Sequence, residues 1–188
     1  QIADEITDAV SVFGLTDSTE INTNNEINDV FKEHDQILID PQGEKKEFRF
    51  IDAIQNALSI DLKKYDNLIL MGQDISDYGG VFKITDGFAD EFGDSRVRNT
   101  PISEAAPLGA ALGLTIAGKK TMVEMQFADF VSCGFNQIVN NLAKTHYRWG
   151  QNCDVVIRMP TGGGLAAGPF HSQSTEAWFF HVPGLKIV

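Results

Sequence analysis

Short apolar segments alternate with helical patterns through the second part of the chain, and this alternation constrains the fold most. The predicted strands are residues 67–71, 96–99, 121–127 and 154–159, with a last strand beginning at Leu185. The predicted helices are residues 48–64, 87–92, 103–117, 130–149 and 175–181. Strands separated by single helices require right-handed crossovers, which predicts an α/β fold: a parallel sheet with helices on both faces.

The first 47 residues differ from the rest, because turn and linker residues dominate them. A short helix at 27–31 and a short strand at 37–39 are the regular elements expected there. We therefore assign residues 1–47 to a largely irregular linker and residues 48–188 to one domain. The chain stops inside an apolar segment without a polar cap, so we expect a piece of a longer polypeptide.

Charge and hydropathy narrow the classes of partner. The net charge of −11 argues against an extended nucleic-acid surface, which needs clustered Lys and Arg. The apolar segments are far shorter than the roughly 20 residues that span a membrane, so no membrane association is expected. Cys133 and Cys153 fall in different predicted elements, which favours free thiols and a cytoplasmic location, with a disulfide as the alternative.

Glu104 is the first candidate site residue. It follows the predicted strand 96–99 and begins the predicted helix 103–117, where the helix dipole favours a carboxylate. Open α/β sheets bind ligands at the carboxyl ends of their strands. Two interpretations remain open: an acidic residue that stabilises a helix terminus, or a carboxylate that bonds a protonated heterocycle nitrogen.

Phe130 and His171 lie beyond two further strand ends. An aromatic ring at that position is suited to stack on a planar ligand, whereas Phe127 is expected to fill the core. His171 follows a Gly-rich loop and is either an acid/base candidate or a surface or capping histidine. The loop 161–168 lacks the Lys-Ser/Thr ending of a phosphate-binding loop, and no spacing of Cys and His indicates a metal site.

Seven short motifs give the chain a family resemblance. They occupy residues 71–75, 78–82, 100–104, 126–130, 135–140, 171–174 and 183–186. From about Phe48 onward the chain resembles the beta subunit of the thiamine-diphosphate-dependent decarboxylating component of 2-oxo acid dehydrogenase complexes. The resemblance implies a pyrimidine-binding, transketolase-like domain.

The same resemblance implies roles for four residues. Glu104 would bond the aminopyrimidine ring of thiamine diphosphate and favour its imino tautomer, and Phe130 would pack on that ring. His171 would lie near the substrate and assist acyl transfer to a lipoyl arm. Val155 would supply a backbone ligand to a structural potassium ion.

The implied enzyme is an oxidoreductase that oxidatively decarboxylates a 2-oxo acid, with a branched-chain acid favoured over pyruvate. Its implied partners are an alpha subunit or domain that binds the diphosphate and Mg²⁺, and the lipoyl domain of an acyltransferase component. A homo- or hetero-oligomer is expected. The domain is expected to be truncated before a C-terminal domain, to come from a fused alpha-beta parent, and to be inactive alone.

Three alternatives remain open: a pyruvate-type dehydrogenase, another transketolase-like enzyme such as a transketolase or a deoxyxylulose phosphate synthase, and a non-catalytic assembly module. The small residues of the predicted helix 103–117 suit close helix packing in such a module. A catalytic domain should present Glu104, Phe130 and His171 near one open edge of the sheet, whereas an assembly module need not.

Overall fold

A computed structural model describes residues 47–188 of the chain. Contacts divide the chain into two units, Gln1–Glu47 and Phe48–Val188, and every described helix and strand lies in the second. The predicted linker, with its short helix at 27–31 and short strand at 37–39, lies outside the described residues except for Glu47.

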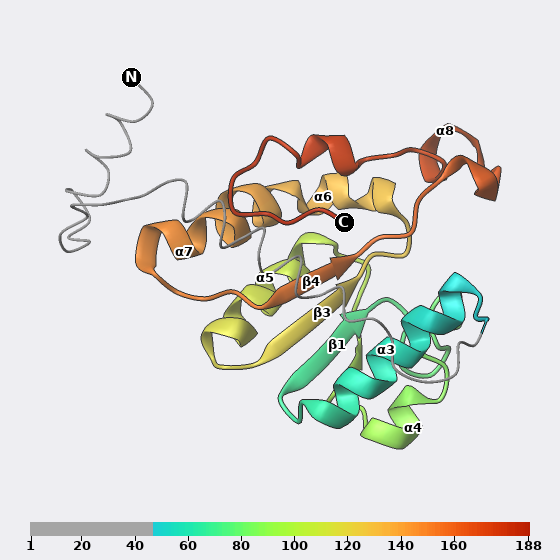
Figure 1. Ribbon diagram of the computed structural model, residues 1–188. Helices are drawn as coiled ribbons and strands as arrows, with labels where there is room; N and C mark the ends of the chain where they lie inside the picture. Colours follow the sequence, from blue (N-terminus) through green and yellow to red (C-terminus); the bar gives the residue numbers. More distant parts are fainter. Residues whose placement is uncertain (1–46) are drawn as a thin grey trace. The chain divides into compact units, whose positions relative to one another are not determined.

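A four-stranded parallel sheet forms the centre of the second unit (Figure 1). Its strands are β1 (Leu68–Gly72), β2 (Val97–Asn99), β3 (Lys120–Glu124) and β4 (Val155–Arg158). Their order is β2-β1-β3-β4, so β1 and β3 occupy the centre. Every residue of β1 is buried, as a continuous apolar run between two covered faces requires.

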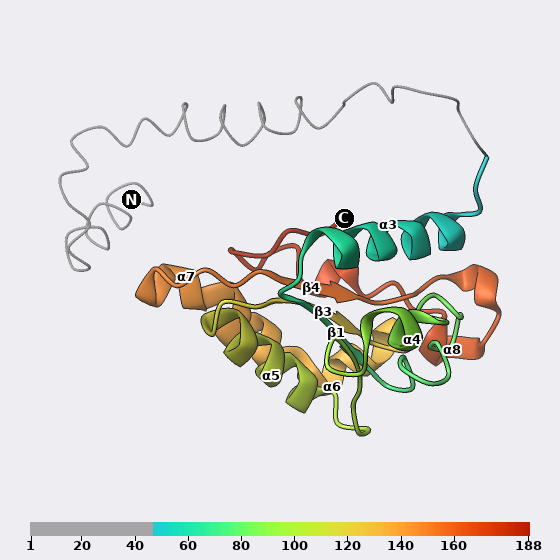
Figure 2. The same cartoon turned by 90° about the horizontal axis from the view of Figure 1, so that it is seen from below.

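Helices cover both faces of the sheet, so the predicted α/β architecture is confirmed (Figure 2). The helices α3 (Phe50–Lys64) and α4 (Phe88–Phe92) share one apolar cluster with Leu68 and Leu70. On the other face, α5 (Ala105–Ile116) and α6 (Val131–Asn136) pack against Ile69 and Met71. Successive strand residues point to opposite faces, which explains how β1 serves two cores.

The long helix predicted for residues 130–149 is divided into several pieces. It begins with the 3₁₀ turn η1 (Ala128–Phe130), continues through α6 and the π-helix η2 (Gln137–Leu142), and ends as α7 (Ala143–Trp149). Ile138 and Leu142, within η2, remain buried in the core. The spacing of apolar residues predicted the helix but carries no signal for one widened turn.

The fifth strand predicted from Leu185 onward is wrong, because Leu185–Val188 forms no strand. Leu185 and Ile187 instead pack against the core cluster beneath α5 and α6. A short apolar run can be buried either as a strand or as an irregular segment that covers the core, and the periodicity of apolar residues does not distinguish the two. The predicted helix 175–181 is likewise reduced to the 3₁₀ turn η4 (Glu176–Trp178).

The predicted loop after β4 contains two short helical pieces. These are the 3₁₀ turn η3 (Gly163–Leu165) and the four-residue helix α8 (Gly168–His171). Cys133 and Cys153 are both free thiols, as the sequence predicts. Within residues 47–188, no helix has both the length and the apolar character needed to cross a membrane.

Candidate functional site

The three residues predicted to form the site lie beyond the carboxyl ends of three strands. Glu104 follows β2 and begins α5, Phe130 ends η1 after β3, and His171 ends α8 after β4. The strands are parallel, so their carboxyl ends lie at one edge of the sheet. The sheet therefore brings Glu104, Phe130 and His171 to the same edge.

Glu104 is half-buried and occupies the N-cap position of α5, yet its side chain makes no capping hydrogen bond. Its Oε1 instead accepts a long hydrogen bond of 3.5 Å from Nε2 of Gln73, which follows β1. A bond of that length is weak. The carboxylate is thus oriented by Gln73 but retains acceptor capacity for a stronger donor.

Gly134 lets α6 approach the start of α5. A Cβ atom at this glycine would collide with Cδ1 of Leu108 and would lie 3.4 Å from the carbonyl oxygen of Glu104. Since α6 continues directly from η1, this close contact fixes Phe130 relative to the Glu104 backbone.

Four rings gather over the end of β3. Phe127 stacks on His171 with ring centroids 4.1 Å apart and an interplanar angle of 20°. Phe130 meets His171 edge-on at 5.5 Å, and Phe82 meets Phe127 edge-on at 5.9 Å. Phe127, expected to fill the core, is only partly buried and provides the surface on which the imidazole lies.

Asp129 contacts the same imidazole. Its Oδ1 lies 2.9 Å from Nδ1 of His171, across 42 residues of sequence. The contact brings α8 against η1, and it depends on the short helix that the sequence did not predict. Asp129 lies within a motif singled out above, but its pairing with His171 has no signal in the sequence.

A buried ion pair closes the ends of β3 and β4. Nη2 of Arg158 lies 2.6 Å from Oε2 of Glu124, and the two side chains are 17% and 2% exposed. Sequence reasoning missed both residues, although a charged residue within each of two apolar strand segments was a usable signal. Gly80, at φ +76°, lies against the pair, because a Cβ there would come within 2.9 Å of Oε1 of Glu124.

Buried polar atoms without a partner gather at this edge. Within the described residues there are four such side-chain atoms, and three belong to residues at or beyond strand carboxyl ends: Thr100 Oγ1, Arg158 Nε and Ser172 Oγ. Such atoms are rare in folded proteins and call for a missing partner.

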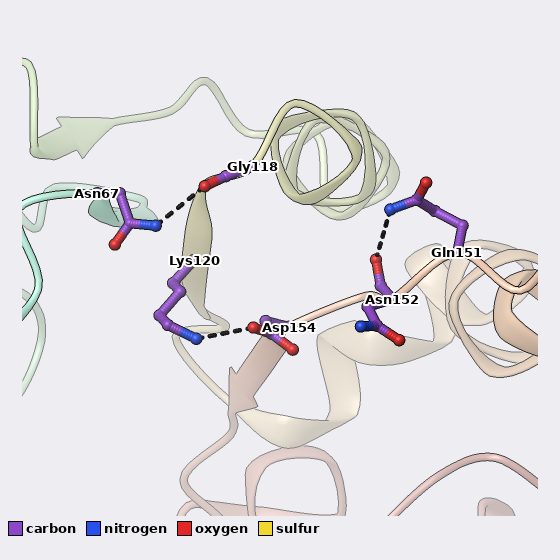
Figure 3. Close-up of polar contacts among 6 residues, drawn as sticks. All are labelled: Asn67, Gly118, Lys120, Gln151, Asn152 and Asp154. Carbon is purple, nitrogen blue, oxygen red and sulfur yellow. Dashed lines mark hydrogen bonds and ion pairs between the residues drawn. The ribbon is translucent and has the colours of Figure 1, made fainter.

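The opposite edge carries a shallow polar hollow of about 260 Å³ (Figure 3). Nζ of Lys120 lies 2.7 Å from Oδ2 of Asp154, and Asn67 donates to the carbonyl of Gly118. A hydrogen bond to Asp154 and the charge of that carboxylate raise the pKa of Lys120. Lys120 pairs with Asp154 in this hollow, and Asn67 pairs with the backbone of Gly118.

Val155 is the first residue of β4 and belongs to the amino edge, away from Glu104 and His171. Its role as a potassium ligand stays a prediction. Residues 47–188 contain no cluster of three or more His, Cys, Asp or Glu side chains suited to a metal ion.

A parallel α/β sheet with a polar and aromatic cluster at its carboxyl edge is the class of fold that holds a ligand at strand ends. The chain belongs to the transketolase pyrimidine-binding domain family, whose model matches residues 46–188.

Among individual relatives, the chain is 42% identical over 141 residues to the 2-oxoisovalerate dehydrogenase subunit beta of Bacillus subtilis, covering 74% of this chain and 43% of that protein. It is 44% identical over 146 residues to the mitochondrial 2-oxoisovalerate dehydrogenase subunit beta 2 of Arabidopsis thaliana, covering 76% and 40%. It is 38% identical over 153 residues to the pyruvate dehydrogenase E1 component subunit beta of Leifsonia xyli, covering 80% and 45%.

The chain therefore spans less than half the length of each of these relatives. Among solved structures it is similar to a split gene transketolase, described as an inactive beta4 tetramer. The TM-score is 0.52 with 21% sequence identity, over 70% of this chain and 39% of the other. At that identity the likeness supports the fold alone.

Proposed function

We propose that the chain is the pyrimidine-binding domain of a thiamine-diphosphate-dependent 2-oxo acid dehydrogenase, in its decarboxylating component. One observation carries the proposal: Glu104, Phe130 and His171 follow three strand ends at one edge of the sheet. The similarity to beta subunits of 2-oxoisovalerate and pyruvate dehydrogenases supports it. An assembly module would not require this convergence.

The side chains at this edge suit the pyrimidine end of thiamine diphosphate. Glu104 is a half-buried carboxylate with one weak partner, and Phe130 is a partly buried ring at the same edge of the sheet. When bound, the cofactor would supply the electron sink for decarboxylation.

The chain's own residues would orient the ring and manage protons. Glu104 would accept a hydrogen bond from a protonated ring nitrogen. Phe130 would present an apolar ring face and exclude water. His171 would hold or move a proton near the 2-oxo acid and assist acyl transfer.

The remaining parts of the site would come from partners. We assign the diphosphate and Mg²⁺ to an alpha subunit or domain, and the acyl acceptor to a lipoyl domain. The oligomer would be completed by further subunits. A potassium ion at the carbonyl of Val155 belongs to the same proposal, as does a cytoplasmic location, although the Arabidopsis relative is named mitochondrial.

Branched-chain 2-oxo acids are the favoured substrates, because the Bacillus and Arabidopsis relatives, both above 40% identity, are named for 2-oxoisovalerate. Pyruvate is the alternative, supported by the Leifsonia relative. Both acids share the reacting group, so the side-chain pocket would set the choice.

The test is an assay of the complete enzyme with its alpha component. Decarboxylation of 3-methyl-2-oxobutanoate and of pyruvate is measured with and without thiamine diphosphate and Mg²⁺. We expect cofactor-dependent turnover, with kcat/KM higher for the branched acid. A preference for pyruvate would replace the substrate assignment, and turnover of neither acid would overturn the proposal.

A further inference from the structure

The imidazole of His171 is held on three sides. Phe127 covers one ring face at 4.1 Å, the ring of Phe130 meets it edge-on at 5.5 Å, and Oδ1 of Asp129 lies 2.9 Å from Nδ1. The Asp129 side chain is 11% exposed, whereas that of His171 is 32% exposed. The carboxylate is therefore well shielded, and the ring keeps a route to solvent.

A carboxylate accepts hydrogen bonds and donates none, so Nδ1 must be the protonated nitrogen at this contact. This holds for the neutral ring, with one proton, and for the imidazolium, with two. The bond that one ring nitrogen makes decides which nitrogen exchanges protons. No hydrogen bond to Nε2 comes from residues 47–188. Proton exchange is thus confined to Nε2.

We propose that Asp129 is a positioning residue that keeps His171 in the Nδ1–H tautomer and makes Nε2 the atom that takes up and returns a proton. On uptake, the Nε2 lone pair forms the new N–H bond, and the Asp129 carboxylate balances the positive charge of the ring. On return, that bond breaks and the neutral Nδ1–H ring is restored. The role of Nε2 in taking up and returning a proton during catalysis rests on the proposed function. The statement that Asp129 fixes the tautomer of His171 does not.

A purely structural role for Asp129, as a tie between η1 and α8, would require the contact but not one particular tautomer. Asp129→Asn separates the two roles, because an amide keeps the size of the side chain. The amide offers an oxygen that accepts from Nδ1–H, or an N–H that donates to a bare Nδ1. The variant therefore keeps a hydrogen bond between η1 and α8 but no longer determines which ring nitrogen is protonated.

The first measurement is ¹⁵N NMR of histidine side chains in the 188-residue chain, at a pH where His171 is neutral. The signals of His171 are identified by their loss in His171→Gln. We expect a protonated Nδ1 and a bare Nε2 in the parent chain, and a mixture of tautomers in Asp129→Asn. Asp154→Asn, which removes a carboxylate at the opposite edge, should leave the pattern unchanged.

A urea midpoint close to that of the parent chain would establish that Asp129→Asn remains folded; Asp129→Ala serves if the amide variant is unfolded. An Nε2–H tautomer in the parent chain would overturn the inference. So would a His171 pattern that is identical in the parent and in a folded Asp129 variant. Neither result depends on enzyme activity.

The second measurement is steady-state kinetics of the complete enzyme. Because acid–base groups contribute about 10²–10⁴-fold, we expect kcat to fall at least about tenfold in Asp129→Asn while KM for the 2-oxo acid changes little. A changed tautomer with unchanged kcat would overturn the role of the His171 tautomer in turnover. Absence of turnover in the parent enzyme would instead count against the proposed function, leaving the tautomer result to stand.

Discussion

Glu104 carries the proposed chemistry at the scale of single residues. Its carboxylate is half-buried at the start of α5 and is not used to cap that helix, so local helix stability depends little on its charge. Gln73 is the side chain that orients it, through a weak bond. Charge and fold are therefore separable at this position.

We predict that Glu104→Gln in the complete enzyme lowers kcat at least about 10²-fold, because the neutral amide no longer stabilises a protonated ring nitrogen. The urea midpoint of the variant should match that of the parent chain. Glu91→Gln is the control: it removes an exposed carboxylate on α4 that pairs with Lys63 on α3, and it should leave turnover unchanged. Normal turnover of the Glu104 variant would remove this residue from the site.

The sequence indicated candidate residues for the site, whereas the contacts among the side chains at this edge could not be predicted from it. Glu104, Phe130 and His171 were predicted because each follows a strand end inside a recognisable motif. The His171–Asp129 contact and the Glu124–Arg158 pair span 42 and 34 residues. Such contacts depend on the strand register and on the short helix α8, neither of which leaves a local pattern.

Two ion pairs join β3 to β4 at the scale of elements, one at each edge of the sheet. Glu124–Arg158 is buried at the carboxyl edge, and Lys120–Asp154 is exposed at the amino edge. Each links residues 34 apart in the sequence, so the pairs differ chiefly in burial. The extent of burial determines how much the free energy of unfolding falls when one partner of a pair is removed.

We predict that Glu124→Ala destabilises the chain by about 2–4 kcal/mol, because it leaves the charge of Arg158, whose side chain is only 17% exposed, without a partner. Replacing both partners, as in Glu124→Leu with Arg158→Met, should cost much less. Urea unfolding of the 188-residue chain measures the loss of stability in the single variant and in the double variant. A double variant as unstable as Glu124→Ala would contradict this explanation.

Lys120→Met is the matched control and should change the urea midpoint little at neutral pH. Asp154 raises the pKa of Lys120 by hydrogen bonding and by its charge. Since the folded-state pKa is the higher one, the pair's contribution is complete below the ordinary lysine pKa. It is lost as the pH rises through the raised value, so Lys120→Met and the parent chain should converge in stability at strongly alkaline pH.

The C-terminal segment completes the core at the scale of the whole molecule, in place of the fifth strand that the sequence predicted. Pro183 and Gly184 turn the chain at the start of α7, and Leu185 and Ile187 then cover the cluster beneath α5 and α6. The four strands and the main helices were predictable from alternating apolar patterns. The packing of this last segment depends on a tertiary contact.

We predict that Gly184→Ala destabilises the chain by about 2–4 kcal/mol, from backbone strain at φ +94° and collision of the new Cβ with the carbonyl oxygen of Ala143. Gly113→Ala is the control, since a Cβ at that position in α5 meets nothing within 4 Å. It should stabilise the chain by about 0.5–1 kcal/mol. Equal urea midpoints for the two variants would show that the turn at Gly184 does not pack on α7.

We also predict that the 188-residue chain alone binds thiamine diphosphate at least about tenfold more weakly than the complex with the alpha component. The proposal assigns the diphosphate and Mg²⁺ to that partner, and the described residues hold no acidic or histidine cluster for a metal ion. Calorimetric titration of the chain and of the complex gives the comparison. Equal affinities would place the whole cofactor site in this chain.

The π-helix η2 should let the continuous helix from α6 to α7 lose one residue more easily than a regular α-helix can. In an α-helix each residue advances the chain by about 100°, so a deletion rotates everything beyond it and exposes buried side chains. A π turn holds one residue more than an α turn. Loss of the exposed Asn140 would let the turn tighten to α geometry, and Ala143 and Thr145 would keep their inward facing.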